Sequence, residues 1–130
     1  MTDERQVQEQ NDEKLINDAF QELLDRYLES KHRKKVEIIT KAFNFARQAH
    51  KGVRRRSGEP YILHPIAVAR IACVEIGLGS TSICSALLHD VVEDTDYTVE
   101  DIENLFGPKI AQIVDGLTKI SGGIFGDRVS

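Results

Sequence analysis

The chain has 130 residues, of which 41% are hydrophobic and 29% are charged, and its formal net charge is −4. This composition is typical of a globular domain, so it excludes collagen-like, low-complexity and disulfide-stabilised proteins. The length fits one domain, and no apolar run approaches the roughly 18 residues of a membrane span. Because the acidic N-terminus is unlike a secretory signal peptide, we expect a cytoplasmic protein without a membrane partner.

The charges are distributed unevenly along the chain. Residues 1–30 carry nine acidic and three basic side chains, residues 31–56 carry one acidic and ten basic, and residues 57–130 carry eleven acidic and four basic. A basic block inside an acidic protein needs an anionic partner or close acidic neighbours. The acidic balance of the whole chain argues against direct DNA or RNA binding, so a small phosphorylated ligand fits the block better.

Apolar residues recur with a period near 3.6 along most of the chain, which predicts helices. The first helix is expected over about 13–29 and the second over about 33–50. The apolar stripe of the first helix packs onto the core or forms a dimer contact. It consists of Leu15, Ile16, Ala19, Phe20, Leu23, Leu24, Tyr27 and Leu28. A loop follows the second helix, because Ser57-Gly58-Glu59-Pro60 has the chemistry of a turn.

Proline, glycine and capping residues delimit the later helices. Pro65 opens a helix to about residue 76, and Ser80 or Thr81 caps the next one. Thr98 and Asp101 form a capping box, and the last helix begins at Pro108. Because no stretch alternates like a hairpin strand, we predict an all-α fold of about six helices. The glycine-rich residues 121–130 are expected to link this chain to further protein.

The two cysteines, Cys73 and Cys84, lie eleven positions apart in apolar segments. No CxxC spacing supports a metal or redox pair. We therefore expect both to be reduced and buried.

The densest polar cluster in an apolar setting is the segment that contains His89, Asp90, Glu93 and Asp94. Adjacent helical residues can both reach an ion lying between them, and an imidazole and a carboxylate suit a divalent metal. Glu93 and Asp94 return to that face one turn later, where they could orient or deprotonate a water. The alternative is the last turn of a helix with solvated acids. His64, at a helix start, offers a further ligand.

His50 stands at the end of the second predicted helix. A histidine in the last turn interacts favourably with the helix dipole when it is charged. We expect this role for His50 at least as much as a role in chemistry.

Four ordered motifs resemble the N-terminal hydrolase domain of RelA/SpoT-type alarmone enzymes, which belongs to the HD phosphohydrolase superfamily. They are Ala49-His50-Lys51-Gly52, Arg55-Arg56-Ser57-Gly58-Glu59-Pro60-Tyr61-Ile62-Leu63-His64-Pro65, His89-Asp90-Val91-Val92-Glu93-Asp94-Thr95 and Val114-Asp115-Gly116-Leu117-Thr118-Lys119. The resemblance covers about residues 36–121. It implies an HD-type helical bundle over residues 33–130, cut short at its C-terminus and preceded by an acidic helical extension over residues 1–32.

The resemblance implies hydrolysis of (p)ppGpp to GDP or GTP plus pyrophosphate, usually with Mn²⁺. His64, His89 and Asp90 are then metal ligands, and Glu93 and Asp94 act near the attacking water. The nucleotide is then bound by Arg55, Arg56 and Ser57. Arginine agrees with an anionic nucleotide, because it offers forked donors to phosphate and a planar face to a base.

The chain departs from the family pattern in two ways. Arg56 stands where many members have lysine, which keeps the charge but changes the donor geometry. The family also uses a metal-binding aspartate in a helix beyond residue 130, and neither Asp115 nor Asp127 matches that position. We therefore expect an incomplete metal site and a fragment that lacks full activity by itself.

The resemblance also implies partners, namely the remainder of a parent chain with synthetase and regulatory domains. A homodimer is a further possibility. Two other functions remain open: a non-catalytic nucleotide-binding or regulatory module of a (p)ppGpp synthetase, and an HD phosphohydrolase that acts on another nucleotide. The Arg-Arg-Ser-Gly-Glu-Pro loop favours (p)ppGpp over another nucleotide, because a generic HD domain need not carry it.

Overall fold

The computed structural model describes residues 3–31 and 34–120, and this part of the chain confirms the predicted all-α fold. It contains six α-helices and one π-helical turn: α1 (Glu4–Leu28), α2 (Val36–Ala49), α3 (Leu63–Ile71), η1 (Ala72–Ile76), α4 (Ser80–Asp94), α5 (Val99–Phe106) and α6 (Pro108–Ile120). Extended pairing within the described ranges is limited to one isolated bridge between Arg54 and Pro60. The predicted linker, residues 121–130, lies outside the described residues.

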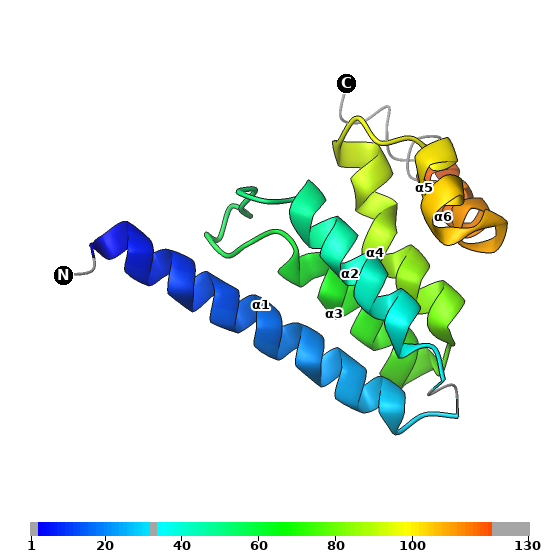
Figure 1. Ribbon diagram of the computed structural model, residues 1–130, viewed down its shortest axis with the longest axis horizontal. Helices are drawn as coiled ribbons and strands as arrows, with labels where there is room; N and C mark the ends of the chain where they lie inside the picture. Colours follow the sequence, from blue (N-terminus) through cyan, green and yellow to red (C-terminus); the bar gives the residue numbers. More distant parts are fainter. Residues whose placement is uncertain (1–2, 32–33, 121–130) are drawn as a thin grey trace.

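Helix α4 is the centre of the bundle and packs against α2, α3 and α6 (Figure 1). Its interior residues Ile83, Leu87, Leu88 and Val91 have no exposed surface. Helices α5 and α6 pack together at one end of the molecule, and α1 runs along the other side beneath α2 and α3 (Figure 1). None of the helices within the described ranges is both long and apolar enough to cross a membrane.

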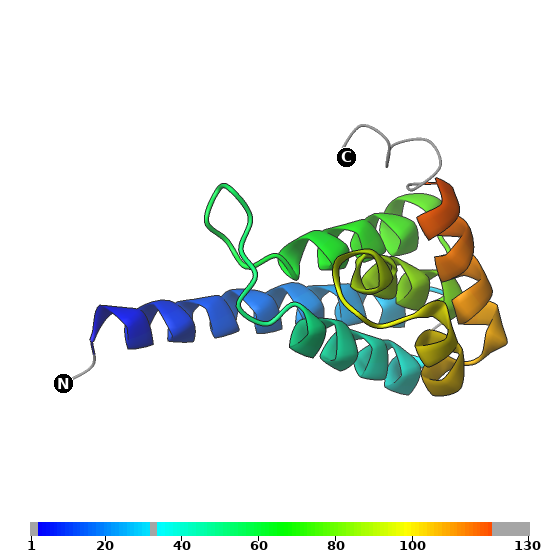
Figure 2. The ribbon, with the colours of Figure 1, turned by 90° about the horizontal axis from the view of Figure 1, so that it is seen from above.

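Helix α1 begins at Glu4, nine residues before the predicted start. A capping box forms there, because Gln6 N–H donates to the Asp3 carboxylate and Asp3 N–H donates to the Gln6 side chain. The prediction was wrong because it followed the apolar stripe, and the first turns are exposed and have none. These turns project beyond the other helices (Figure 2).

The apolar face of α1 packs onto the core, which is the first of the two contacts left open by the sequence. Its buried residues are Ile16, Phe20, Leu23 and Tyr27. The Phe20 ring stacks on Phe43 of α2 with 3.9 Å between the ring centroids. Leu15 and Leu28 of the predicted stripe are instead about half exposed. The buried residues are therefore the middle of the predicted stripe, and Leu15 and Leu28 lie at its two edges.

The starts of the later helices agree only in part with the predictions. The Thr98–Asp101 capping box is present, and α6 begins at Pro108 as predicted. The N-cap of α4 is Gly79, and neither Ser80 nor Thr81 provides a side-chain cap. Those two residues are instead the first two of the helix.

The helix predicted from Pro65 to about residue 76 ends where predicted, but it starts earlier and changes its pitch. Helix α3 begins two residues earlier, at Leu63, and it changes into the π-helical turn η1 at Ala72. Gly77 then ends the segment with φ of 79°, in the left-handed region that glycine adopts without strain. The sequence could not predict this change of helical pitch, because a five-residue segment is too short to show a different spacing of apolar residues.

Both cysteines are free and buried, as predicted. Burial raises the pKa of Cys73, and it raises the pKa of Cys84 to about 12. Because the thiolate is the reactive species, we expect a thiol-labelling reagent at pH 8 to leave both cysteines unmodified in the folded chain. Both should react once urea unfolds the chain, and mass spectrometry counts the adducts. Rapid labelling of the native protein would contradict the buried assignment.

Candidate functional site

His89 and Asp90 lie side by side in the C-terminal half of α4. His89 Nε2 is 3.0 Å from Asp90 Oδ1, and His89 Nδ1 is 2.8 Å from the carbonyl oxygen of Ala86. Because a carbonyl only accepts, Nδ1 carries a proton and donates it to Ala86. The ring orientation is therefore set by the backbone of α4 itself.

Tyr61, from the segment before α3, is the second hydrogen-bond partner of Asp90. Its hydroxyl donates to Asp90 Oδ2 at 2.7 Å, so both carboxylate oxygens of this buried residue have a partner. The sequence prediction assigned no role to Tyr61. A tyrosine inside an apolar run has no local signal for a partner 29 positions away, and the tertiary structure alone shows the contact.

The pKa values at this cluster follow from these contacts. Burial by itself would raise the pKa of Asp90, but the hydrogen bonds from His89 and Tyr61 outweigh it and hold the pKa below its usual value. The hydrogen bond to Asp90 raises the pKa of His89. The contact between the two side chains therefore favours the charged form of each.

Asp94 lies one turn after Asp90 on the same face of α4. Partial burial and the negative charge of Asp90 raise its pKa. Glu93 stands one turn after His89, where its charge contributes to the raised pKa of that histidine, and it is exposed. The predicted return of both acids to the His–Asp face is seen in the structure.

His50 is buried beside the same cluster. It is the C-cap of α2, only 3% exposed, and its Nε2 is a buried atom without a hydrogen-bond partner in the described structure. Its ring lies 4.9 Å from the Tyr61 ring. Burial lowers the pKa of His50 although Asp94 and Asp90 oppose it. The neutral ring favoured here does not suit the predicted dipole interaction, and an unpaired buried nitrogen suits a bound water or ligand.

His64 lies near the same cluster without joining it at ligand distance. It is the second residue of α3, it is partly buried, and its ring centroid is 5.9 Å from that of Tyr61. Across the described ranges, no three His, Cys, Asp or Glu side chains gather closely enough to hold an ion. The structure therefore pairs two of the three predicted ligands, His89 and Asp90, and leaves His64 beside them.

The donor atoms of this pair nevertheless suit a divalent cation. The pair offers an imidazole nitrogen and a carboxylate oxygen 3.0 Å apart, and these donor types suit a divalent ion. The bond from His89 Nδ1 to a backbone carbonyl is the usual support for a metal-ligating histidine. The His–Asp pair fits a metal in donor type and outer contacts, with His64 as the nearby third donor.

Arg55, Arg56 and Ser57 lie together in the exposed turn between α2 and α3. Arg55 N–H donates to the Glu59 carbonyl at 2.9 Å, and Ser57 Oγ donates to the Glu59 carboxylate at 2.7 Å. The guanidinium of Arg55 is 3.9 Å from the same carboxylate. The turn is thus internally bonded while its arginine side chains face solvent, and it leads directly into Tyr61.

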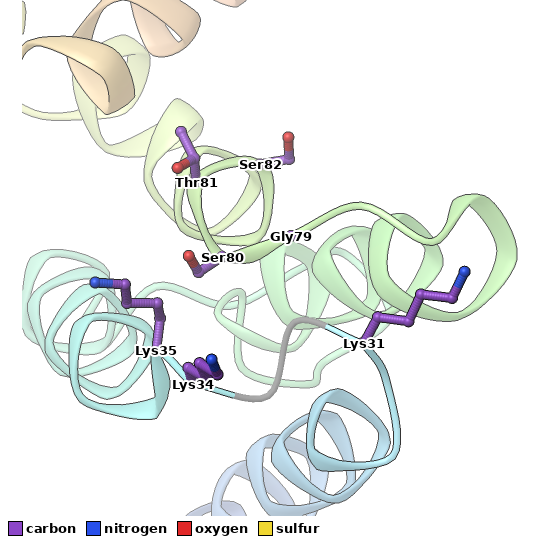
Figure 3. Close-up of a pocket in the computed structure, with 7 residues that line it drawn as sticks. All are labelled: Lys31, Lys34, Lys35, Gly79, Ser80, Thr81 and Ser82. Atoms are coloured by element: carbon purple, nitrogen blue, oxygen red, sulfur yellow. The ribbon is translucent and has the colours of Figure 1, made fainter.

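A separate cavity of about 410 Å³ lies at the N-terminus of α4 (Figure 3). Its lining consists of basic and small polar residues: Lys31, Lys34, Lys35, Gly79, Ser80, Thr81 and Ser82. At 1.5 Å per residue, it is about 12 Å along α4 from the His–Asp pair. Part of the basic block therefore lies away from the chemistry of His89 and Asp90.

Comparison with known families matches residues 42–123 to the HD domain. The chain belongs to the HD domain family. The matched range contains every predicted site residue, including the His–Asp pair on α4. HD hydrolases use a divalent metal, which agrees with the donors described above.

Curated relatives confirm the resemblance to the RelA/SpoT-type members of the HD family. A guanosine-3′,5′-bis(diphosphate) 3′-pyrophosphohydrolase from Vibrio cholerae is 42% identical over 111 residues, which are 85% of this chain and 15% of that protein. The bifunctional (p)ppGpp synthase/hydrolase SpoT of Escherichia coli is 41% identical over 111 residues, again 85% of this chain and 15% of that protein. The chain thus spans about 15% of the length of these relatives.

A solved structure of a metazoan ortholog of SpoT has the same fold. It superposes with a TM-score of 0.58 at 38% sequence identity, and the match covers 61% of this chain and 46% of that chain. That ortholog is described as hydrolysing ppGpp.

Proposed function

We propose that this HD chain takes part in removing the 3′-pyrophosphate of (p)ppGpp, giving GDP or GTP plus pyrophosphate, with Mn²⁺ as the metal. The observation that carries the proposal is the His89–Asp90 pair, oriented by Ala86 and Tyr61. The functions for which the Vibrio cholerae relative and the metazoan ortholog are named support this substrate.

His89 and Asp90, with His64 as a third donor, would hold the metal ion. Such an ion polarises a phosphoryl oxygen and lowers the pKa of its bound water. Neighbouring residues of this chain orient the side chains of His89 and Asp90. Ala86 fixes the His89 ring, and Tyr61 donates to one Asp90 oxygen, which leaves the other oxygen directed at His89 Nε2.

Asp94 and Glu93 are proposed to act on the proton of the attacking water. The raised pKa of Asp94 makes its carboxylate a stronger base than an ordinary aspartate. Glu93 stays exposed one turn from His89 and is free to reach a substrate from the solvent side. We assign proton acceptance to Asp94 and orientation of the water to Glu93.

The turn that carries Arg55, Arg56 and Ser57 is proposed to bind the nucleotide. The substrate is highly anionic, and exposed guanidinium groups provide forked donors for phosphate and a planar surface for guanine. The internal bonds of this turn lower the entropy that ordering it on binding would otherwise cost.

Two other functions are compatible with the same fold. The chain could bind the nucleotide without turnover and relay a signal to a synthetase, since one relative is a bifunctional synthase/hydrolase. It could also hydrolyse another nucleotide. Four further expectations stay predictions. They are the synthetase and regulatory partners, the cytoplasmic location, the homodimer, and the boundary between an extension over 1–32 and a domain over 33–130.

The function is tested by measuring pyrophosphate release from ppGpp with Mn²⁺. The assay uses the 130-residue chain and the same chain extended at its C-terminus, because the resemblance implies a metal ligand beyond residue 130. ppGpp binding is measured in parallel by calorimetry. We expect release that stops when a chelator is added, at least from the extended chain.

Each other result selects a different function. Binding of ppGpp without release supports the regulatory module. Release from another nucleotide but not from ppGpp supports the broader phosphohydrolase. Absence of both binding and release from a folded protein would refute the proposed substrate.

A further inference from the structure

Three arginines hold α1 on the body of the protein. Arg54 pairs with Asp12 at 2.7 Å, Arg70 pairs with Glu22 at 2.8 Å, and Arg47 donates to Asn17 at 3.1 Å. Arg47 and Arg54 belong to the basic block of the sequence. Part of that block is therefore neutralised by the acidic N-terminal helix.

The Arg54–Asp12 contact differs from the others in its geometry. Two guanidinium nitrogens of Arg54 donate to the two carboxylate oxygens of Asp12, at 2.7 and 3.3 Å. The Asp12 side chain is only 19% exposed, whereas Glu22 in the Arg70 pair is 51% exposed. A forked arginine–carboxylate pair restricts orientation as well as distance. Asp12 therefore holds Arg54 in one position.

The same guanidinium also closes the turn that follows it. Arg54 Nε donates to the carbonyl oxygen of Gly58 at 2.6 Å, and the backbone of Arg54 pairs with Pro60 in the isolated antiparallel bridge. Every guanidinium nitrogen of Arg54 is thus used, one toward the turn and two toward α1. One side chain ties the helix to the turn.

The tied turn carries the residues proposed for nucleotide binding and leads into the His–Asp cluster. Arg55 and Arg56 lie between Arg54 and Gly58, the two residues whose hydrogen bond closes the turn. Tyr61 N–H donates to Val53 at the base of the turn, and the Tyr61 hydroxyl donates to Asp90. The turn projects from the helices near the outer half of α1 (Figures 1 and 2).

We propose that Asp12 and Arg54 are positioning residues, through which α1 orders the Arg55–Ser57 turn for the nucleotide. This inference rests on the proposed function for the identity of the ligand. When the carboxylate of Asp12 is removed, Arg54 is released from α1 and the turn samples more conformations. Binding a nucleotide must then restrict those conformations, which weakens affinity. Helix α1 is thereby a part of the nucleotide-binding unit.

Limited trypsin digestion without nucleotide tests the coupling directly, since Arg55 and Arg56 are cleavage sites in the turn. We expect Asp12→Asn to speed cleavage there by roughly two- to fivefold, the range that one exposed ion pair supports. Glu22→Gln is the matched control, because it removes another α1 ion pair that is remote in sequence from the turn. It should leave the cleavage rate in the turn unchanged, and Asp12→Glu should restore most of the wild-type rate.

Calorimetric titration with ppGpp tests the consequence for binding. We expect Asp12→Asn to raise the Kd by a similar factor relative to Glu22→Gln, with both variants keeping the helical circular dichroism of the wild type. Equal cleavage rates or equal Kd values in the two variants overturn the inference. Failure of both the 130-residue chain and the C-terminally extended chain to bind or hydrolyse ppGpp refutes the proposed function instead. The nucleotide-free digestion still shows whether Asp12 orders the turn.

Discussion

Replacing Asp90 with asparagine is expected to abolish metal-dependent turnover and to weaken divalent-cation binding by more than about 100-fold, since even outer-shell substitutions cost 10–100-fold. Asp90 is 6% exposed, and its two oxygens contact Tyr61 and His89. Asparagine keeps the shape but removes the charge, so His89 loses its anionic partner and the metal loses a carboxylate. Calorimetric titration with Mn²⁺ and the pyrophosphate-release assay measure the two effects.

Asp96→Asn is the matched control for this substitution. Asp96 is an exposed aspartate two residues beyond the end of α4, so the same chemical change there should leave Mn²⁺ affinity and turnover at wild-type values. If Asp90→Asn binds Mn²⁺ as tightly as Asp96→Asn does, the metal assignment is wrong. Unchanged helical circular dichroism in both variants shows that the loss is local to the site.

Replacing Leu87 with alanine is expected to produce the largest loss of stability. Leu87 has no exposed surface and lies in α4, the helix that packs against α2, α3 and α6. Truncating a fully buried leucine lowers the free energy of unfolding by about 2–5 kcal/mol. That is a large share of the roughly 5–15 kcal/mol that stabilises a domain. Urea unfolding followed by circular dichroism measures the change.

Leu15→Ala separates burial from helix propensity. Leu15 lies in a helix as well, but its side chain is 51% exposed, so we expect a change below about 1 kcal/mol. Comparable destabilisation by the two substitutions would mean that Leu87 does not pack as the structure has it.

The helical elements were predictable where an apolar period or a capping signal marked them. The Thr98–Asp101 capping box and the start of α6 at Pro108 are local features, formed by residues within one turn of each other. The first turns of α1 were missed because they are held by a polar cap and bury nothing. The π-helical turn at Ala72–Ile76 was missed because a change of pitch over five residues leaves no periodicity.

The candidate site was predictable in its composition but not in its contacts. Adjacency in the sequence places His89 beside Asp90, and helical geometry returns Asp94 to their face. Neither argument predicts the contact of the Tyr61 hydroxyl with Asp90, which is 29 positions away in the sequence. Neither predicts the buried, unpaired ring nitrogen of His50. The metal-binding role of His64 and the nucleotide-binding role of the Arg55–Ser57 turn stay proposals.

The sequence by itself determined the all-α class, the HD family and the chemical types gathered around α4, because periodicity, caps and ordered motifs are properties of neighbouring residues. Only the tertiary structure showed which acidic residues pair with the basic block and that the apolar face of α1 packs onto the core. Those outcomes depend on contacts such as Asp12 with Arg54, separated by 42 positions. Burial and long-range pairing are set by how all the helices pack together, and no local pattern specifies that arrangement.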